Sequence, residues 1–274
     1  MKHFKNLLLC LILLVCFKTA PADSPYIKKI FLLQKPKSKQ KILISHSCHT
    51  QGIALFKNYL FLSCVDKKEK KAYLYRLKQN SQKNFVLDKK IDLTIYDQYH
   101  PSGIDIDNSC LWIAVAQYHP APARSTVLCL DPELASLKPK FSFNISDHIG
   151  AICLIDNLLV ALNWDSKDFY ILSTSGRVIK RLKNTSAVAY QDCKHFSSNV
   201  IICGGKARSR GYIDFLSLNG GLKLIRRIEV KKRSAKGHIL TREGLCFKDE
   251  MLYLLPDDLP YPTLYSFTFK GIVK

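Results

Sequence analysis

Ten polar side chains recur at five places in the chain, each just before or within a short apolar run. Imidazole nitrogens and carboxylate oxygens can ligate a divalent cation or transfer a proton, while amides, hydroxyls and guanidinium groups can orient a bound molecule. If the five places meet in space, this composition predicts a metal or small-molecule site. The ten residues are His49, Gln51, His100, Ser102, Asp147, His148, Gln191, Asp192, Arg242 and Glu243.

The residue types divide these side chains, together with Asp105 on the second apolar run, into three predicted roles. A metal-bound water with a histidine as proton carrier would suit hydrolysis of a phosphate or carboxylic ester. The predicted catalytic residues are His49, His100 and Glu243. The predicted metal ligands are His49, His100, His148, Asp192 and Glu243. The predicted ligand-binding residues are Gln51, Ser102, Asp105, Gln191 and Arg242. The alternative interpretation is that these groups hydrogen-bond to one another and simply seal a channel.

The five places share one sequence pattern. A polar tip and a glycine lead into an apolar strand, a tight turn and a second apolar strand, most clearly over Thr241 to Asp258. The glycines or their equivalents fall near positions 52, 103, 150, 192 and 244. A period of roughly 40 to 53 residues is typical of four-stranded propeller blades, and no stretch has the apolar period of a helix.

This repeat predicts an all-β fold, a five-bladed β-propeller of four-stranded antiparallel blades. The fifth copy lacks a fourth strand, and Tyr26–Leu33 is a strand without a copy of its own. We therefore expect Tyr26–Leu33 to pair beside Thr263–Phe269 and close the last blade, with Gln34–Lys41 as a basic connection. A six-bladed ring is the alternative if the basic stretches conceal another blade. Innermost strands run along the central channel, so their polar tips should converge at one mouth.

One copy also carries a resemblance to known families. Arg242-Glu243-Gly244-Leu245, followed by Leu252 to Asp258, resembles the two inner strands of phytase-like esterase, calcium-activated apyrase and gluconolactonase-type propellers. The whole chain is similar to an uncharacterised secreted bacterial propeller family. The resemblance implies that acidic groups at the channel entrance, here Glu243 and Asp192, bind calcium or another divalent ion. Histidine and glutamine replace acids at the other tips, and imidazole favours a transition metal over calcium.

The N-terminal residues have the pattern of a secretory signal. Lys2 and Lys5 precede the apolar run Leu7–Phe17, and Ala20-Pro21-Ala22 supplies small residues for cleavage. This apolar run is too short to span a bilayer comfortably. The sequence thus predicts a signal peptide at 1–22, a single propeller domain at 23–274, no transmembrane segment in the mature chain, and a periplasmic or secreted location.

The chain has ten cysteines, and eight of them follow the predicted signal. An even number in an exported chain is typical of disulfides. Cys193 and Cys203 flank a turn and could face each other across a hairpin. The cysteines inside apolar strands are interpreted as small hydrophobic residues. These are Cys64, Cys129, Cys153 and Cys246.

The formal net charge is +20, from 42 Lys and Arg against 22 Asp and Glu. The densest basic run, Arg226 to Lys236, could contact an anionic polymer or a protein partner. Nucleic acid is not expected, because aromatic residues do not interleave with the basic run. The sequence supports two hypotheses about function. The first is a small-molecule or metal site at the channel mouth, which could hydrolyse esters. The second is a non-enzymatic scaffold that binds partners through its basic surface. The sequence leaves open whether the chain is an enzyme.

Overall fold

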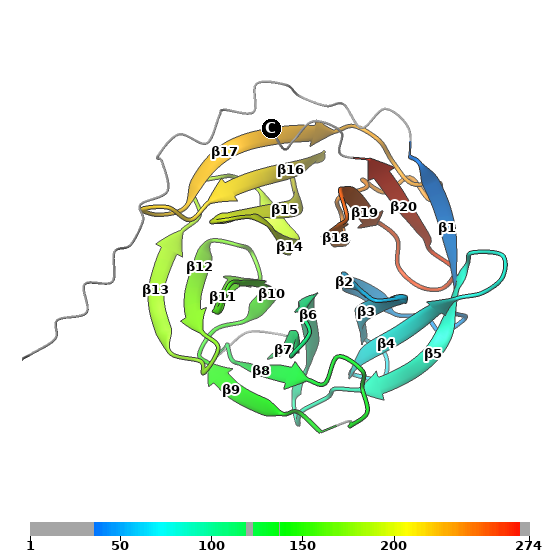
Figure 1. The fold of residues 1–274 in the computed structure, drawn as a ribbon, viewed down its shortest axis with the longest axis horizontal. Coiled ribbons are helices and arrows are strands. Elements are labelled where there is room, and N and C mark those ends of the chain that lie inside the picture. Colours follow the sequence, from blue (N-terminus) through cyan, green and yellow to red (C-terminus); the bar gives the residue numbers. More distant parts are fainter. Residues whose placement is uncertain (1–35, 119–122, 137, 269–274) are drawn as a thin grey trace, which may run out of the picture.

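The computed structural model describes residues 36–118, 123–136 and 138–268. Within these ranges every regular element is a β-strand, and the strands form three four-stranded sheets and one eight-stranded sheet. The sheets stand around a central axis as in a β-propeller (Figure 1). Among the described residues, no helix has the length and apolar character needed to cross a membrane. The prediction of an all-β propeller of antiparallel four-stranded units is confirmed.

Each four-stranded sheet is a meander whose strands are neighbours in both sequence and space. The first contains β6 (Gln98–Ile106), β7 (Leu111–Gln117), β8 (Ser125–Leu130) and β9 (Phe141–Ile145). The second contains β10 (Ile149–Ile155), β11 (Leu158–Asn163), β12 (Asp168–Ser173) and β13 (Val178–Lys183). The third contains β14 (Ala189–Ser197), β15 (Val200–Ala207), β16 (Arg210–Ser217) and β17 (Lys223–Val230).

The eight-stranded sheet consists of two antiparallel halves, which meet along a short parallel pairing of Ile42 with Phe85 and Leu43 with Val86. One half contains β2 (His49–Phe56), β3 (Tyr59–Asp66), β4 (Lys71–Gln79) and β5 (Phe85–Asp92). The other contains β18 (Gly244–Lys248), β19 (Met251–Leu255), β20 (Thr263–Thr268) and β1 (Ser38–Leu43). Each half therefore repeats the four-stranded unit of the other sheets.

The strand that completes the last half comes from the N-terminal side of the chain. β1 pairs antiparallel with β20 along Ser38–Lys41. This strand lies in the stretch that was predicted to be a basic connection, and the predicted closing strand Tyr26–Leu33 falls outside the described residues. The connection prediction was wrong because Lys39 and Lys41 alternate with less exposed residues and face solvent, which is common on an outer strand.

The innermost strands β2, β6, β10, β14 and β18 surround the axis (Figure 1). Each contacts the next, and β18 contacts β2. Their C-terminal residues line one cavity, so the strands run in the same direction along the axis. Their first residues therefore meet at the opposite end of the channel, which we call the strand-start mouth.

Apolar side chains fill the spaces between neighbouring sheets. The inner strand β3 is buried at every position after Tyr59, whereas the outer strand β13 is mostly exposed. Five buried clusters occupy the successive interfaces between four-stranded units, including the interface between the first and last units. A strand buried on both faces reads as a continuous apolar run, which explains why the inner hairpins were visible in the sequence.

Three disulfides join neighbouring strands or their flanking residues. Their Cα–Cα separations are 5.8, 5.2 and 4.1 Å for Cys48–Cys64, Cys110–Cys129 and Cys193–Cys203, respectively. The third bond was predicted, because its cysteines face each other in the β14–β15 ladder. Bonds of this kind suggest an oxidising, extracellular or periplasmic environment.

The interpretation of the strand cysteines as hydrophobic residues was wrong for Cys64 and Cys129. Their partners, Cys48 and Cys110, lie one residue outside β2 and β7 and were not matched to a facing strand. The interpretation is confirmed for Cys153 and Cys246, which are free thiols. Burial raises the pKa of both thiols, so they remain protonated and unreactive.

Candidate functional site

The strand-start mouth collects polar residues from two kinds of strand end. The innermost strands begin there, and the second strands end there because they run antiparallel to the first. His49 begins β2, and Asp66 ends β3. Glu243 directly precedes β18, and Asp258 follows β19. Segments that are far apart in sequence are therefore brought to one mouth.

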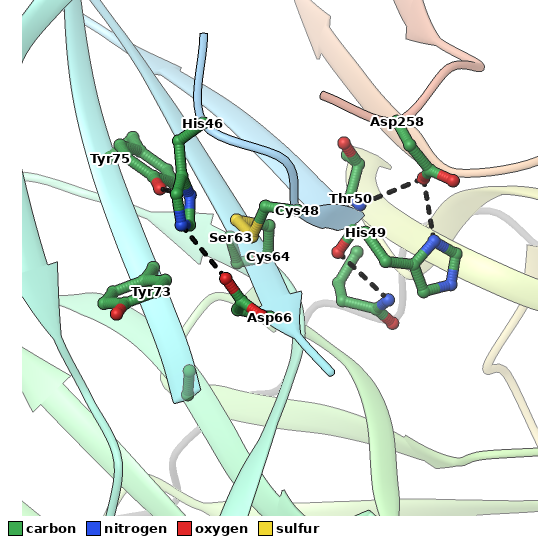
Figure 2. The surroundings of a disulfide bond; sticks show 12 residues. His46, Cys48, His49, Thr50, Ser63, Cys64, Asp66, Tyr73, Tyr75 and Asp258 are labelled. Atoms are coloured by element: carbon green, nitrogen blue, oxygen red, sulfur yellow. Dashed lines mark hydrogen bonds and ion pairs between the residues drawn. A yellow bond between two sulfur atoms is a disulfide. The ribbon is translucent and has the colours of Figure 1, made fainter. Parts of the chain in front are cut away.

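His49, Glu243 and Asp258 form a group of metal-ligating side chains. The Nδ1 of His49 lies 2.7 Å from the Oδ1 of Asp258 and 3.9 Å from the Oε1 of Glu243. One ligand atom from each residue lies within 4.8 Å of the other two. The Thr50 N–H donates to the same Asp258 oxygen at 3.2 Å and fixes the carboxylate beside the imidazole (Figure 2). One nitrogen and two carboxylate oxygens suit a divalent transition metal.

The guanidinium of Arg242 contacts both carboxyl groups of this group. Its Nε lies 2.9 Å from the Oε1 of Glu243, and its Nη2 lies 3.3 Å from the Oδ2 of Asp258. A carboxylate has lone pairs for more than one partner. Arg242 nevertheless competes with any bound cation for these oxygens.

The surroundings shift the pKa values of the two carboxyl groups in opposite directions. Burial raises the pKa of Glu243 well above its usual value, although Arg242 acts in the opposite direction. Burial would also raise the pKa of Asp258, but the hydrogen bond with His49 and the charge of Arg242 outweigh it and lower that pKa. Two neighbouring carboxyl groups whose pKa values are moved apart in this way are typical of sites that need both an acid and a base.

A cavity of about 660 Å³ adjoins the group. Its walls include His49, Asp258 and Arg242, and also Asp66 and Lys67 from the end of β3 and the turn that follows it. Ligand cavities typically have volumes of about 300–1,000 Å³, so a small organic molecule would fit. The cationic side chains in its wall favour an anionic ligand.

His100 and His148 form a second histidine group at the same mouth. The Nδ1 of His100 lies 2.7 Å from the Nε2 of His148. The rings of Trp164 and Tyr118 pack against His100, and Trp164 also packs against His148. Burial lowers the pKa of His148 to about 4 and, together with His148 and His49, lowers the pKa of His100 well below its usual value. Both rings are therefore neutral at neutral pH.

Asp192 lies at the axis and binds backbone. Its Oδ2 accepts the N–H groups of Ile53 on β2 and Leu245 on β18, both at 3.1 Å. Its Oδ1 accepts the ammonium of Lys194, which is also buried. A Cβ atom on Gly52 would lie 2.5 Å from the Cα of Gly103, so glycine at this position allows the two backbones to approach closely at the axis. These contacts give Asp192 a clear structural role.

The remaining predicted residues are distributed more widely. Ser102 is fully buried, donates to the carbonyl of Gly103 at 2.6 Å, and accepts the Ala114 N–H. Gln51 is buried beside His49, and Gln191 is half-buried on β14. Asp105 lies in the cavity at the opposite end of the channel, where its Oδ2 accepts the Leu154 N–H. The structure therefore brings His49, Arg242 and Glu243 together and places Asp105 away from them.

The sequence analysis missed several residues at the mouth. Asp258 was recognised as the acidic end of a strand, but it was not assigned to the site. His46, Asp66 and Glu69 were not considered, although they form a second group of metal-ligating side chains. These residues could have been found from the sequence, because each acidic residue lies at or near the end of the second strand of a hairpin. The second strand runs antiparallel to the innermost strand, so its end lies at the mouth where the innermost strand begins.

The predicted basic surface is partly engaged within the protein. Arg226 is buried, and Arg227 pairs with Asp214 at 2.7 Å. Lys236 donates to the carbonyl oxygens of Asp258 and Pro260. The described part of this run is therefore not a continuous row of free cations.

Solved structures with the same fold include enzymes. The glutaminyl cyclase of Myxococcus xanthus is 10% identical, with a TM-score of 0.58 over 83% of this chain and 93% of that one. A luciferin-regenerating enzyme is 10% identical, with a TM-score of 0.52 over 84% and 80%. A Bacteroides caccae protein of unknown function is also 10% identical, with a TM-score of 0.52 over 83% and 81%. At such identities the similarity establishes the propeller fold alone.

Residues 26–235 match the family described as "Family of unknown function (DUF6454)". The search of curated proteins returned no match.

Proposed function

The chain belongs to the DUF6454 family of unknown function, and from that premise we propose that its strand-start mouth binds a divalent metal ion and a small anionic ester. One observation carries the proposal: His49, Glu243 and Asp258 bring three ligand atoms within 4.8 Å of one another at the edge of a cavity. The fold itself is shared with two enzymes, a glutaminyl cyclase and a luciferin-regenerating enzyme.

The donor set fits a transition metal better than calcium. Calcium takes six to eight oxygen ligands, whereas imidazole suits zinc, manganese and iron. Three protein ligands would leave positions for water and substrate, as in hydrolytic zinc sites. The main obstacle is Arg242, which already contacts both carboxyl groups.

The proposed reaction is hydrolysis of a phosphate or carboxylic ester. When bound, the cation would supply Lewis acidity and a more acidic water. Burial and the neighbouring histidines hold the pKa of His100 well below its usual value, so His100 would act as a neutral hydrogen-bonding group rather than as the proton carrier. Arg242 and Lys67 would orient the anionic part of the ester in the cavity.

The test is a titration of the purified, disulfide-intact protein with Zn²⁺, with Mn²⁺ and Ca²⁺ as comparisons. His49→Ala and Glu243→Gln should each weaken zinc binding at this site by more than about tenfold. Hydrolysis of p-nitrophenyl phosphate should fall with it, and p-nitrophenyl acetate serves as the uncharged ester for comparison. His100→Ala should lower hydrolysis while zinc stays bound.

The competing guanidinium supplies an internal control. Arg242→Gln removes the cation that occupies the carboxylate oxygens, so it should tighten zinc binding about tenfold while weakening the ester. Zinc binding that is the same in wild type, His49→Ala and Glu243→Gln would refute the metal site.

We further propose that the ring is complete with five four-stranded blades, the eight-stranded sheet counting as two. The closed series of contacts among the innermost strands supports this count over six. We also propose that residues 1–22 are a cleaved signal and that 23–274 form one exported domain, which agrees with the three disulfides.

A further inference from the structure

A second group of metal-ligating side chains lies across the Cys48–Cys64 disulfide from His49 (Figure 2). It consists of His46, Asp66 and Glu69, each with one ligand atom within 4.8 Å of the other two. The Nε2 of His46 lies 3.0 Å from the Oδ2 of Asp66. Because His46 and Asp66 lie two residues from the bonded cysteines, the disulfide fixes the loop that carries the histidine against the strand that carries the aspartate.

Two tyrosine hydroxyls form hydrogen bonds with this group and orient its side chains. The hydroxyl of Tyr75 lies 2.8 Å from the Nδ1 of His46, and the hydroxyl of Tyr73 donates to the Oε2 of Glu69 at 2.7 Å. Burial, with Glu69 adding, raises the pKa of Tyr73, so its phenol stays protonated and donates. Partners of this kind fix the ligand atoms of metal sites and are a regular part of them.

The carboxylates of this second group are not paired with lysine or arginine side chains of the described residues. The Oδ1 of Asp66 accepts the N–H groups of Lys68 and Glu69, each at 2.9 Å, which leaves Oδ2 directed at His46. Among the described residues, no lysine or arginine pairs with the carboxylate of Asp66 or Glu69. This group differs in that respect from the His49 group, where Arg242 contacts both acids.

We propose that His46, Asp66 and Glu69 form a second site for a divalent cation of the zinc or manganese class. The ion would bind the Nε2 of His46 and a carboxylate oxygen of each acid, and mixed nitrogen and oxygen donors select this class of metal. With Nε2 on the ion, Nδ1 carries the proton and donates to the oxygen of Tyr75. All three ligands line the 660 Å³ cavity, so ions and water can reach them.

The ligands of this second site are different residues from the ligands of the site in the proposed function. His46 and His49 can therefore be substituted separately as matched variants. They flank the same disulfide, and their side chains are 28% exposed for His46 and 27% exposed for His49. Zn²⁺ titration of the disulfide-intact chain by calorimetry should show two equivalents. His46→Ala and His49→Ala should each lose a different one, and the double variant should lose both.

Tyr75→Phe tests the positioning role. It removes only the partner of the His46 Nδ1, so it should weaken one zinc equivalent about tenfold and leave the other unchanged. The visible absorption spectrum of the Co²⁺-loaded protein reports on the same site and does not depend on catalytic activity. Its His46-dependent absorption should shift in Tyr75→Phe and persist in His49→Ala.

The outcomes separate the two proposals. If His46→Ala, Glu69→Gln and Tyr75→Phe all titrate as wild type, the second site is refuted whatever His49→Ala does. If His49→Ala titrates as wild type while His46→Ala loses an equivalent, the proposed function loses its metal and the second site stands. Glu69→Gln replaces His46→Ala if the latter fails to fold, because Glu69 is an exposed turn residue.

Discussion

His100 and His148 share a hydrogen bond in surroundings from which water is largely excluded. His100 is only 3% exposed to solvent, and His148 is only 2% exposed. The Nδ1 of His148 has no hydrogen-bond partner among the described residues. A proton added to either ring would therefore lack solvation, so the pair couples the stability of the fold to pH.

The contribution of this pair to the free energy of unfolding should decrease as the pH falls from about 6.5 to about 4, while the raised pKa values of Asp192 and Glu243 act in the opposite direction. Burial lowers the pKa of His148 to about 4, whereas the unfolded chain titrates near 6.5, so the unfolded state binds the proton first. The loss from His148 alone is about 3 kcal/mol, and His100 adds to it. Urea unfolding of the wild type and of His148→Gln at about pH 7 and about pH 4.5 measures this loss as the difference between the two proteins. The wild type should become less stable relative to His148→Gln at the lower pH, and an unchanged difference would contradict the role of His148.

Residue types and spacing predicted part of the candidate site. His49 and Glu243 were selected from the sequence, and their ligand atoms lie 3.9 Å apart. Asp192 was selected by the same logic, but its carboxylate accepts backbone N–H groups along the axis. Which way a side chain points at the channel is decided by neighbouring strands, and that information is absent from one strand's sequence.

Strands β2, β14 and β18 are tied together by a single carboxylate. Asp192 on β14 accepts one N–H from each of the other two strands and holds the ammonium of Lys194. Asp192 and Asp105 raise the pKa of Lys194 against the effect of burial. The ammonium is therefore charged and depends on Asp192 for its counter-charge.

Asp192→Asn should lower the free energy of unfolding by roughly 3–5 kcal/mol, because it leaves a buried ammonium without its partner. Adding Lys194→Met should recover part of this loss, since the orphaned charge is then gone. Urea unfolding of the wild type, both single variants and the double variant measures the coupling. A loss below about 1 kcal/mol in Asp192→Asn would mean that this carboxylate does not tie the strands.

The inner hairpins were predictable because strands buried on both faces are continuous apolar runs with turn residues between them. The outer strand β1 was not, because only one of its residues, Ile42, is fully buried and lysines fill its solvent positions. A strand of this kind has the composition of a loop. Its pairing partner, rather than its own sequence, makes it a strand.

The interface between the first and last four-stranded units closes the ring. Ile42 is fully buried in a cluster that includes Phe85 of β5 and Leu264 of β20. The repeat period predicted a ring, and the shortfall of one strand predicted closure from the N-terminal side. The sequence did not reveal that Ser38–Leu43 supplies this strand, because its fit depends on a surface formed by both units.

Ile42→Asp should destabilise the fold by several kcal/mol, because it places a charge in the closing interface. Leu43→Asp is the matched control, since Leu43 is the next residue of the same strand and is 41% exposed. Surface substitutions usually change stability by within about 0.5 kcal/mol. Thermal unfolding of both variants provides the measurement. Similar melting temperatures would show that β1 does not close the ring.

Cys48 stands between His46 and His49, and its sulfur is bonded to Cys64. The disulfide therefore adds a covalent anchor to a segment that backbone hydrogen bonds from Leu259 and Tyr261 also hold. A chain without this bond should bind the two proposed ions more weakly. Oxidation would then favour metal loading, as expected for a protein that matures in an oxidising compartment.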